Sequence, residues 1–303
     1  MPEVPVPEDS AQRNGRNPPE RALSRVEFAF TPPFDAAAVL GNLRAHLVAG
    51  AERVDGDTIT RIIGATSGPV VVSVTLTPEA VSADIGSTDE ADVPAVTAII
   101  RRWFDLDLDP SAVAGALGGD PVIGPLLTAR PGLRVVGSPH DFETAVMTVL
   151  GQQVSLAAAR TFGARLVAAF GQAGPGGLTG FPTAEILASA SPDDLRAAVG
   201  LTGARARTLH GLAAACAAGL PLGAGADPAR FRSDLLALPG IGPWTVDYLA
   251  VRVLGDRDAF TASDLVLRRS LGGVNVAAAE AASEAWRPYR AYALFHLWTA
   301  SSY

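Results

Sequence analysis

A glycine-bounded hairpin between two helix-like segments constrains this chain more than any other feature. Residues 238–243 read LPGIGP, and apolar residues recur at steps of three and four on both sides. Only glycine takes left-handed backbone angles without steric cost, so Gly240 and Gly242 permit a tight turn. Pro243 suits the first turn of a helix, where its missing N–H would be unpaired anyway. The sequence therefore predicts helix, hairpin and helix over about residues 229–254.

A hairpin of this kind presents backbone N–H groups at the start of a helix. We expect the amides of Gly240, Gly242 and Thr245 to point outward, where a phosphate group can bind them. Hairpins of this kind occur in many DNA-binding modules that catalyse nothing, so the motif alone indicates binding and not a reaction.

The basic residues restrict the possible chemistry. All 24 are arginine, and the chain has no lysine, so no side-chain amine can form a Schiff base. The net charge of −7 is unusual for a nucleic-acid-binding protein, although residues 200–303 hold ten arginines against eight acids. The single cysteine, Cys216, excludes a disulfide framework and a multi-thiolate zinc site. Binding through hairpin amides and a local arginine face is compatible with this balance.

The first 24 residues predict a disordered tail, because they hold five prolines and no apolar stretch. No run of about 18 apolar residues appears anywhere, so we expect no membrane contact and a cytoplasmic location, associated with the nucleoid in a prokaryote. Residues 25–105 then predict a small α+β domain, an antiparallel sheet with helices on one face. Strand-like alternation recurs in it around two helical segments, in the order βαβββα.

Residues 106–303 show almost only helical periodicity. We expect an all-helical bundle in two halves with a cleft between them, interrupted by a glycine-rich loop over residues 171–180. The overall prediction is an α+β chain: the sheet domain first, then the helical domain that contains the hairpin.

The hairpin, a downstream acid and an aromatic tail together resemble the helix-hairpin-helix DNA glycosylases, most closely those of the 3-methyladenine DNA glycosylase II type. The resemblance runs from about residue 25 to the C-terminus. Its segments are LPGIGPWTVDYLA, TASDLVLRRSL, RPGLR at 130–134, LGQQVS at 150–155 and YALFHLW at 292–298. It implies that the segment around 105–137 joins the late helices across the cleft.

Asp264 is the candidate catalytic residue. By position alone, an acid preceding Leu265 and Leu267 is most simply a helix cap. In the resemblance, the acid that starts this helix faces the sugar, and the two roles are compatible. We therefore expect the Asp264 carboxylate to stabilise an oxocarbenium-like sugar as the base departs and to orient or deprotonate the attacking water.

Aromatic residues gather in the same region, since three of the four tryptophans follow Pro243. Trp244 and Tyr248 are four residues apart and share one helix face. Trp298 falls on the stretch that resembles the base pocket of the family. An electron-rich ring attracts a cationic methylated purine by roughly 0.5–2 kcal/mol. These three residues are therefore the expected base pocket.

The resemblance also assigns roles to residues outside this pocket. Glycosylases that also cut the DNA strand carry a lysine where this chain has Trp244, so we expect no lyase step. The residue that fills the gap left by the extruded base corresponds to Gln153, where relatives place an apolar residue. Leu265 stands where relatives often have tyrosine. Structural Na⁺ or K⁺ is implied at three hairpin carbonyls, those of Leu236, Leu238 and Ile241, and no other cofactor is expected.

The sequence thus predicts a monomeric, monofunctional DNA N-glycosylase of base excision repair. Its partner is duplex DNA with damaged bases, and its substrates are alkylated purines such as 3-methyladenine and 7-methylguanine. Two alternatives stay open: a non-catalytic protein of the same fold that binds damaged DNA, and a glycosylase specific for hypoxanthine or mismatches. Among the histidines, His46 and His210 are expected to be structural or surface residues, whereas His296, two residues before Trp298, is the one that could approach the cleft.

Overall fold

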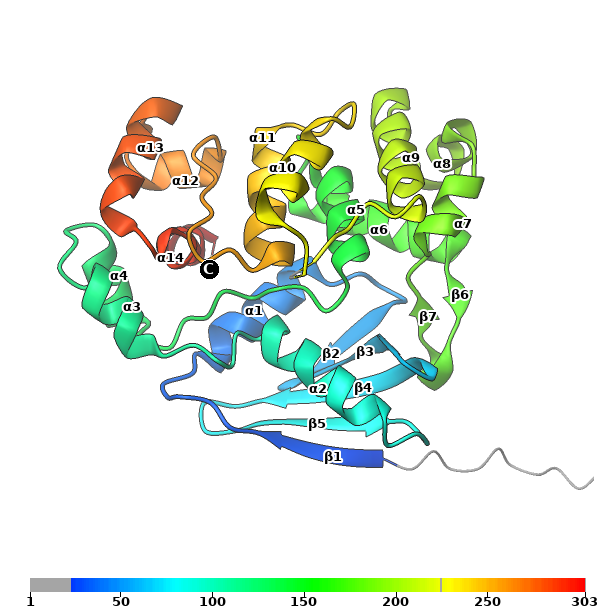
Figure 1. The fold of residues 1–303 in the computed structure, drawn as a ribbon, viewed down its shortest axis with the longest axis horizontal. Helices are drawn as coiled ribbons and strands as arrows, with labels where there is room; N and C mark the ends of the chain where they lie inside the picture. Colours follow the sequence, from blue (N-terminus) through cyan, green and yellow to red (C-terminus); the bar gives the residue numbers. More distant parts are fainter. Residues whose placement is uncertain (1–22, 224, 303) are drawn as a thin grey trace, which may run out of the picture.

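Five antiparallel strands form the sheet of the N-terminal part (Figure 1). The computed structural model describes residues 23–223 and 225–302, so most of the predicted tail lies outside them. Across the sheet the strands follow the order β1 (Leu23–Phe28), β5 (Val81–Gly86), β4 (Gly68–Leu76), β3 (Thr58–Ala65) and β2 (Glu52–Asp55). β1 begins two residues before the predicted domain start. The short β2 was not predicted, because its four residues carry too little alternation.

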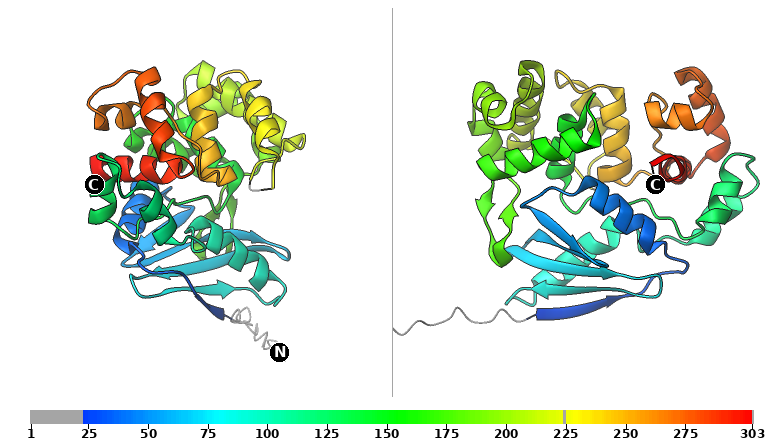
Figure 2. Two further views of the ribbon diagram at one scale, coloured as in Figure 1. Left: turned by 60° about the vertical axis from the view of Figure 1, so that its left-hand side comes forward. Right: turned by 180° about the vertical axis from the view of Figure 1, so that it is seen from behind.

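Two helices pack on this sheet and share its core. α1 (Ala36–His46) starts at Asp35, whose carboxylate accepts a hydrogen bond from the Ala38 N–H at 2.9 Å. α2 (Asp92–Trp103) contacts β1 and β3. In the two views of Figure 2, α1 lies between the sheet and the helical part of the molecule. This position lets α1 supply side chains to the boundary between the two parts.

The helical part begins with α3 and continues to the C-terminus. Its helices are α3 (Pro110–Leu117), α4 (Ile123–Ala129), α5 (Asp141–Gly151), α6 (Leu156–Phe170), α7 (Ala184–Ser189), α8 (Pro192–Val199), α9 (Gly203–Ala217), α10 (Pro228–Leu236), α11 (Pro243–Leu249), α12 (Leu265–Ser270), α13 (Val276–Ser283) and α14 (Arg290–Ser302). Shorter elements are β6 (Gln172–Ala173), η1 (Pro175–Gly177), β7 (Thr179–Gly180), the π-helical turn η2 (Ala250–Leu254) and η3 (Glu284–Trp286). The predicted α+β class is confirmed, with an antiparallel sheet followed by helices.

Three details differ from the sequence prediction. The glycine-rich stretch predicted as a loop contains the β6–β7 pair. α4 was not predicted, because Gly124 and Pro125 interrupt its helical signal, although a proline in the first turn of a helix is tolerated. The second hairpin helix, predicted to Leu254, changes to π-helical geometry at Ala250, which the apolar spacing does not distinguish.

The early helices α3 and α4 lie with the last helices of the chain (Figure 1). The Trp286 indole donates to Asp120 Oδ2 at 2.9 Å, and the Tyr292 hydroxyl donates to Asp105 Oδ2 at 2.9 Å. The expected join between residues 105–137 and the late helices is therefore confirmed. It leaves α5–α11 as the other half of the helical part.

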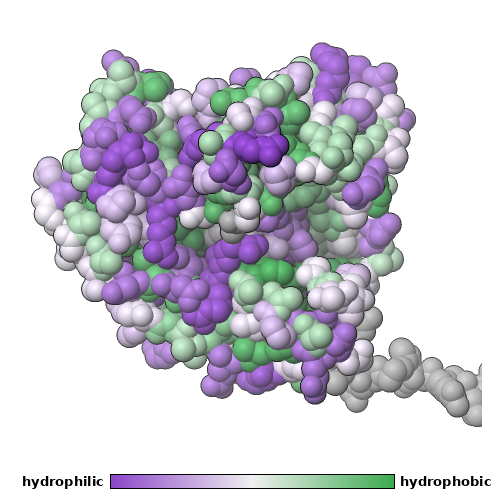
Figure 3. All heavy atoms as spheres, viewed as in Figure 1, coloured by the Kyte–Doolittle hydropathy of each residue, from purple (hydrophilic) through white to green (hydrophobic). Residues whose placement is uncertain are grey.

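The outer surface is mixed in polarity. Figure 3 shows hydrophilic side chains in the middle of the face seen in Figure 1, between the helices and the sheet. Among the described residues, no helix combines the length and hydropathy that spanning a bilayer requires.

The carboxyl group of Asp105, at the junction of the two parts, should make stability depend on pH. Burial raises its pKa to about 6, against the opposing effects of the Tyr292 hydrogen bond and the Arg257 charge. The folded state therefore holds this proton more tightly than the unfolded chain. The free energy of unfolding should therefore be highest below pH 4. It should fall by up to about 3 kcal/mol as the pH rises through about 6.

Urea unfolding of wild type and Asp105→Asn between pH 4 and pH 7 measures this effect. Asparagine tolerates the positive φ of residue 105 (50°) and still accepts from Tyr292. The stability of the variant relative to wild type should rise over this range. Asp107→Asn, a substitution of an exposed residue two positions away, should leave the wild-type profile unchanged. Parallel profiles for wild type and Asp105→Asn would contradict the prediction.

Candidate active site

The hairpin joins α10 and α11, with Gly240 in the left-handed conformation that only glycine adopts at little cost (φ 87°). A β-carbon at Gly240 would also lie 1.9 Å from the hydroxyl oxygen of Thr208. Gly242 has φ of −106° and open space around it, so the expectation that both glycines serve left-handed geometry is wrong for Gly242. One glycine makes the turn, and the other keeps the outer surface of the hairpin small.

The N–H groups of Gly240, Gly242 and Thr245 donate to no backbone or side-chain acceptor within the described part of the chain. Thr245 as a whole is only 2% exposed, so the accessible amides of the hairpin are those of Gly240 and Gly242, and the expectation of an outward-facing amide is not met at Thr245. Gln152, the residue that follows α5, contacts the hairpin. Its amide nitrogen donates to the Gly240 carbonyl at 3.1 Å and to the Thr245 hydroxyl at 3.0 Å.

Gln153 follows at the exposed end of α5. Its φ of 55° is unusual for a residue other than glycine. The preceding carbonyl, that of Gln152, accepts a hydrogen bond from Arg205 on α9. Strained backbone held in place by its neighbours is typical of functional positions. The structure therefore places the predicted wedge residue on an exposed, fixed turn beside the hairpin.

Asp264 caps α12, where its Oδ1 accepts from the Leu267 N–H at 2.8 Å. Two indoles bind the same carboxylate. Trp298 Nε1 donates to Oδ1 at 3.1 Å, and Trp244 Nε1 donates to Oδ2 at 3.0 Å. The residue is only 9% exposed. Oδ1 thus accepts two hydrogen bonds and Oδ2 one, so the free lone pair of the carboxylate is on Oδ2.

An aromatic wall stands beside this carboxylate. The rings of Trp244 and Tyr248 stack with centroids 5.3 Å apart, and Tyr248 lies 5.8 Å from Trp298. All three residues line a cavity of about 260 Å³ that Asp264 also lines. The structure therefore brings together the four residues that the sequence singled out for the site. Leu265, by contrast, is more than half exposed.

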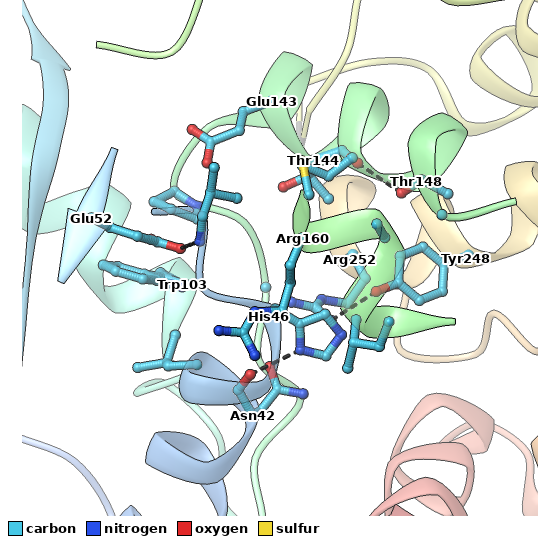
Figure 4. A pocket seen from close by; sticks show the side chains of 18 of the residues that line it. Asn42, His46, Glu52, Trp103, Glu143, Thr144, Thr148, Arg160, Tyr248 and Arg252 are labelled. Atoms are coloured by element: carbon cyan, nitrogen blue, oxygen red, sulfur yellow. Dashed lines mark hydrogen bonds between the residues drawn. The ribbon is translucent and has the colours of Figure 1, made fainter. Parts of the chain in front are cut away.

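A second cavity of about 360 Å³ adjoins the first (Figure 4). The two share Asn42, His46, Leu156, Trp244, Tyr248 and Arg252. Its inner wall includes a buried ion-pair network in which Arg61 binds Glu52 at 2.9 Å and Glu143 at 2.5 Å. The second cavity is larger, but Asp264 does not line it. The candidate catalytic carboxylate therefore faces the smaller cavity.

Two histidines lie in different surroundings. His46, expected to be structural or on the surface, lines both cavities. His296, which by its sequence position could approach the cleft, is buried, and burial lowers its pKa to about 4. Burial also raises the pKa of the Cys216 thiol to about 11, which makes this thiol a poor nucleophile. The described residues hold no cluster of three or more histidine, cysteine or acidic side chains that could bind a metal.

Sequence reasoning missed Asn42, His46, Gln152 and Arg252. Arg252 donates to the Tyr248 hydroxyl at 3.0 Å and lies over its ring. Its position four residues after Tyr248 was a usable signal. For Asn42 and His46 no signal existed, because they come from the sheet domain, where no catalytic pattern appears.

Comparison with known proteins places both parts of the chain. The family model of the AlkA N-terminal domain matches residues 25–139, and that of the HhH-GPD superfamily base excision DNA repair protein matches residues 146–287. The chain is 34% identical over 273 residues to DNA-3-methyladenine glycosylase 2 of Escherichia coli K12. That match covers 88% of this chain and 94% of that protein.

Another relative is the probable bifunctional transcriptional activator/DNA repair enzyme AlkA of Mycobacterium tuberculosis, 42% identical over 276 residues. The match covers 88% of this chain and 55% of that protein, so the chain spans about half the length of this relative. Among solved structures, the 3-methyladenine DNA-glycosylase from Archaeoglobus fulgidus superposes with a TM-score of 0.78 at 22% identity. It covers 91% of this chain and 98% of that one, and shares the fold.

The family models and the Escherichia coli relative together place the chain in the HhH-GPD superfamily of base excision DNA repair proteins. Its sheet domain and its 34% sequence identity to the Escherichia coli protein, over 94% of that protein, narrow the class further. The chain belongs to the AlkA family, that of the DNA-3-methyladenine glycosylases of type II.

Proposed function

We propose that the chain is a monofunctional DNA N-glycosylase that extrudes alkylated purines from duplex DNA and removes them by hydrolysis. The observation that carries the proposal is the Asp264 carboxylate, held by two indole N–H groups in the wall of an aromatic cavity. Family membership supports base excision repair as the setting. The proposed unit of action is the monomer.

In the proposed mechanism, the Oδ2 oxygen of Asp264 faces the sugar of the extruded nucleotide. The glycosidic bond breaks with its electron pair going to the base, and the carboxylate stabilises the positive charge that develops on the sugar. Water then attacks the anomeric carbon, and its proton passes to Asp264. A cationic methylated purine leaves as a neutral base, so it needs no proton from the protein.

The rings of Trp244, Tyr248 and Trp298 form the proposed base pocket. Their faces attract a cationic base by roughly 0.5–2 kcal/mol. Arg252 binds the Tyr248 hydroxyl and lies over the ring, so its positive charge opposes part of this attraction. The aromatic faces by themselves should therefore accept alkylated purines broadly and bind each of them weakly.

The proposed DNA contacts come from two turns side by side. The amides of Gly240 and Gly242 would bind a phosphate, and Gln153 would fill the gap left by the extruded base. The carbonyls of Leu236 and Ile241 accept no hydrogen bond from the described residues, whereas that of Leu238 accepts from Ile241 N–H at 3.1 Å. Such carbonyls fit a monovalent cation, which would bridge the hairpin to the phosphate.

Measurement of base release from methylated duplex DNA tests the proposal. Purified protein should produce alkali-labile abasic sites and release free methylated purines. If the protein binds this DNA and releases no base, the non-catalytic alternative holds. If it releases only hypoxanthine or a mismatched base from a panel of lesion duplexes, the narrower glycosylase alternative holds.

We further expect no strand cleavage. A lyase step forms a Schiff base between an amine and the sugar, and no side chain of this chain offers an amine. Abasic products should stay unbroken until alkali is added, and borohydride should trap no protein–DNA adduct. A bifunctional glycosylase with its own substrate is the positive control. A borohydride-stable adduct at a yield comparable to that control would contradict the expectation.

A further inference from the structure

We infer that two side chains of the sheet domain, those of Asn42 and His46, contact the extruded base. Their hydrogen-bonding groups, called here the polar edge of the pocket, select 6-oxopurines that carry a proton on N1. Hypoxanthine and 7-methylguanine are of this kind. The inference rests on the proposed function, because it assigns a substrate class to the same pocket. Both residues lie in the last turns of α1, and both line the cavity of Asp264 and the cavity beside it.

The hydrogen bond of His46 determines which ring nitrogen is available. Nδ1 lies 2.8 Å from the backbone oxygen of Asn42. A carbonyl oxygen only accepts, so Nδ1 donates and Nε2 of the neutral ring is an acceptor. Within the described part of the chain, no donor reaches Nε2. Figure 4 shows the ring beside Asn42, with Arg252 and Tyr248 nearby.

The surroundings of His46 keep its ring neutral. Burial lowers the pKa of His46 to about 4, and the positive charges of Arg252 and Arg160 act in the same direction, against the backbone hydrogen bond. At neutral pH the Nε2 lone pair is therefore retained. A neutral ring also adds no positive charge that would repel a cationic base.

The Asn42 side chain completes the edge. Its amide makes no hydrogen bond to the described residues, so one donor and one acceptor are available. Nε2 of His46 and the amide NH₂ of Asn42 complement the N1–H and O6 of a 6-oxopurine. Adenine-type bases such as 3-methyladenine have a bare N1, and its lone pair would face that of Nε2. The aromatic faces of the pocket cannot make this distinction, since every base has a π-face.

Single-turnover excision from three substrates tests the inference: duplexes with one hypoxanthine, duplexes with one 7-methylguanine, and 3-methyladenine in methylated DNA. His46→Leu should lower excision of the two 6-oxopurines about 10-fold, which corresponds to one lost hydrogen bond. It should leave 3-methyladenine release within about 2-fold. His46→Gln, which keeps an acceptor, should restore part of the lost rate. His210→Leu on α9, outside both cavities, is the matched control.

Binding of free bases gives a readout that needs no catalysis. Trp244 and Trp298 line the cavity, so a bound base should quench tryptophan fluorescence. Wild type should bind hypoxanthine at least about 5-fold more tightly than adenine, and His46→Leu should abolish this preference. Equal loss on all substrates, or no loss in a variant that melts like wild type, would overturn the inference. If wild type releases no base at all, the proposed function fails, and base binding still decides the inference.

Discussion

Asp264→Asn is expected to reduce base excision by at least about 10³-fold while the protein stays folded. Asparagine is as good a helix cap as aspartate, and its amide oxygen can still accept a hydrogen bond from the Leu267 N–H. The charge that stabilises the sugar cation and receives the proton from water is lost. The amide NH₂ would meet the indole N–H of Trp244, a donor facing a donor, so a stability loss of about 1–2 kcal/mol is expected.

Single-turnover release of 7-methylguanine measures the rate, and thermal melting confirms folding. Asp109→Asn is the matched control, because Asp109 caps α3 far from the cavity and accepts from the Ser111 N–H at 2.9 Å. That variant should excise at the wild-type rate. Turnover of Asp264→Asn within 10-fold of wild type would exclude Asp264 as the catalytic residue.

Gly240→Ala is expected to destabilise the protein by roughly 2–4 kcal/mol and to weaken DNA binding. The positive φ costs about 1 kcal/mol or more for alanine, and the new methyl group overlaps the Thr208 hydroxyl. Gly242→Ala offers a matched control in the same hairpin, because its φ is negative and no described atom beyond residue 242 and its two chain neighbours lies within 4 Å of the added carbon. It should change stability by less than about 0.5 kcal/mol.

Urea unfolding and fluorescence anisotropy with an abasic duplex measure the two effects. Adding Thr208→Ala to Gly240→Ala removes the overlap but not the backbone strain, so part of the stability should return. Equal stability of the two single variants would show that the left-handed geometry of Gly240 does not matter. Loss of DNA binding in Gly242→Ala with full stability would instead locate the phosphate contact at the outer face of the hairpin.

The indole–carboxylate arrangement has a consequence for the pocket itself. Trp244 and Trp298 belong to the proposed base pocket and also orient the Asp264 carboxylate through their Nε1 protons. If a base stacks there as proposed, its stacking and the position of the carboxylate are coupled through the same two side chains. A phenylalanine at either position would keep a ring face and lose the hydrogen bond.

Much of the fold could be predicted from local patterns. Ser191, Pro192 and Asp194 predicted the start of α8, where the structure shows a capping box. Alternation at Val70, Val72 and Val74 predicted β4, whose alternate residues are buried. Strand β2 and the β6–β7 pair were missed, because each is too short to show a period and is held by its neighbours.

The sequence by itself determined the hairpin, the carboxylate at the start of α12 and the absence of a side-chain amine, because each depends on a few adjacent residues or on composition. Only the tertiary structure decided which groups meet that carboxylate. The Trp298 indole is 34 residues away from it along the chain, and the Gln152 amide reaches Gly240 from 88 residues away. Asn42 and His46 come from another domain. Such contacts arise from packing of whole helices, which leaves no periodic or local mark on the residues that take part.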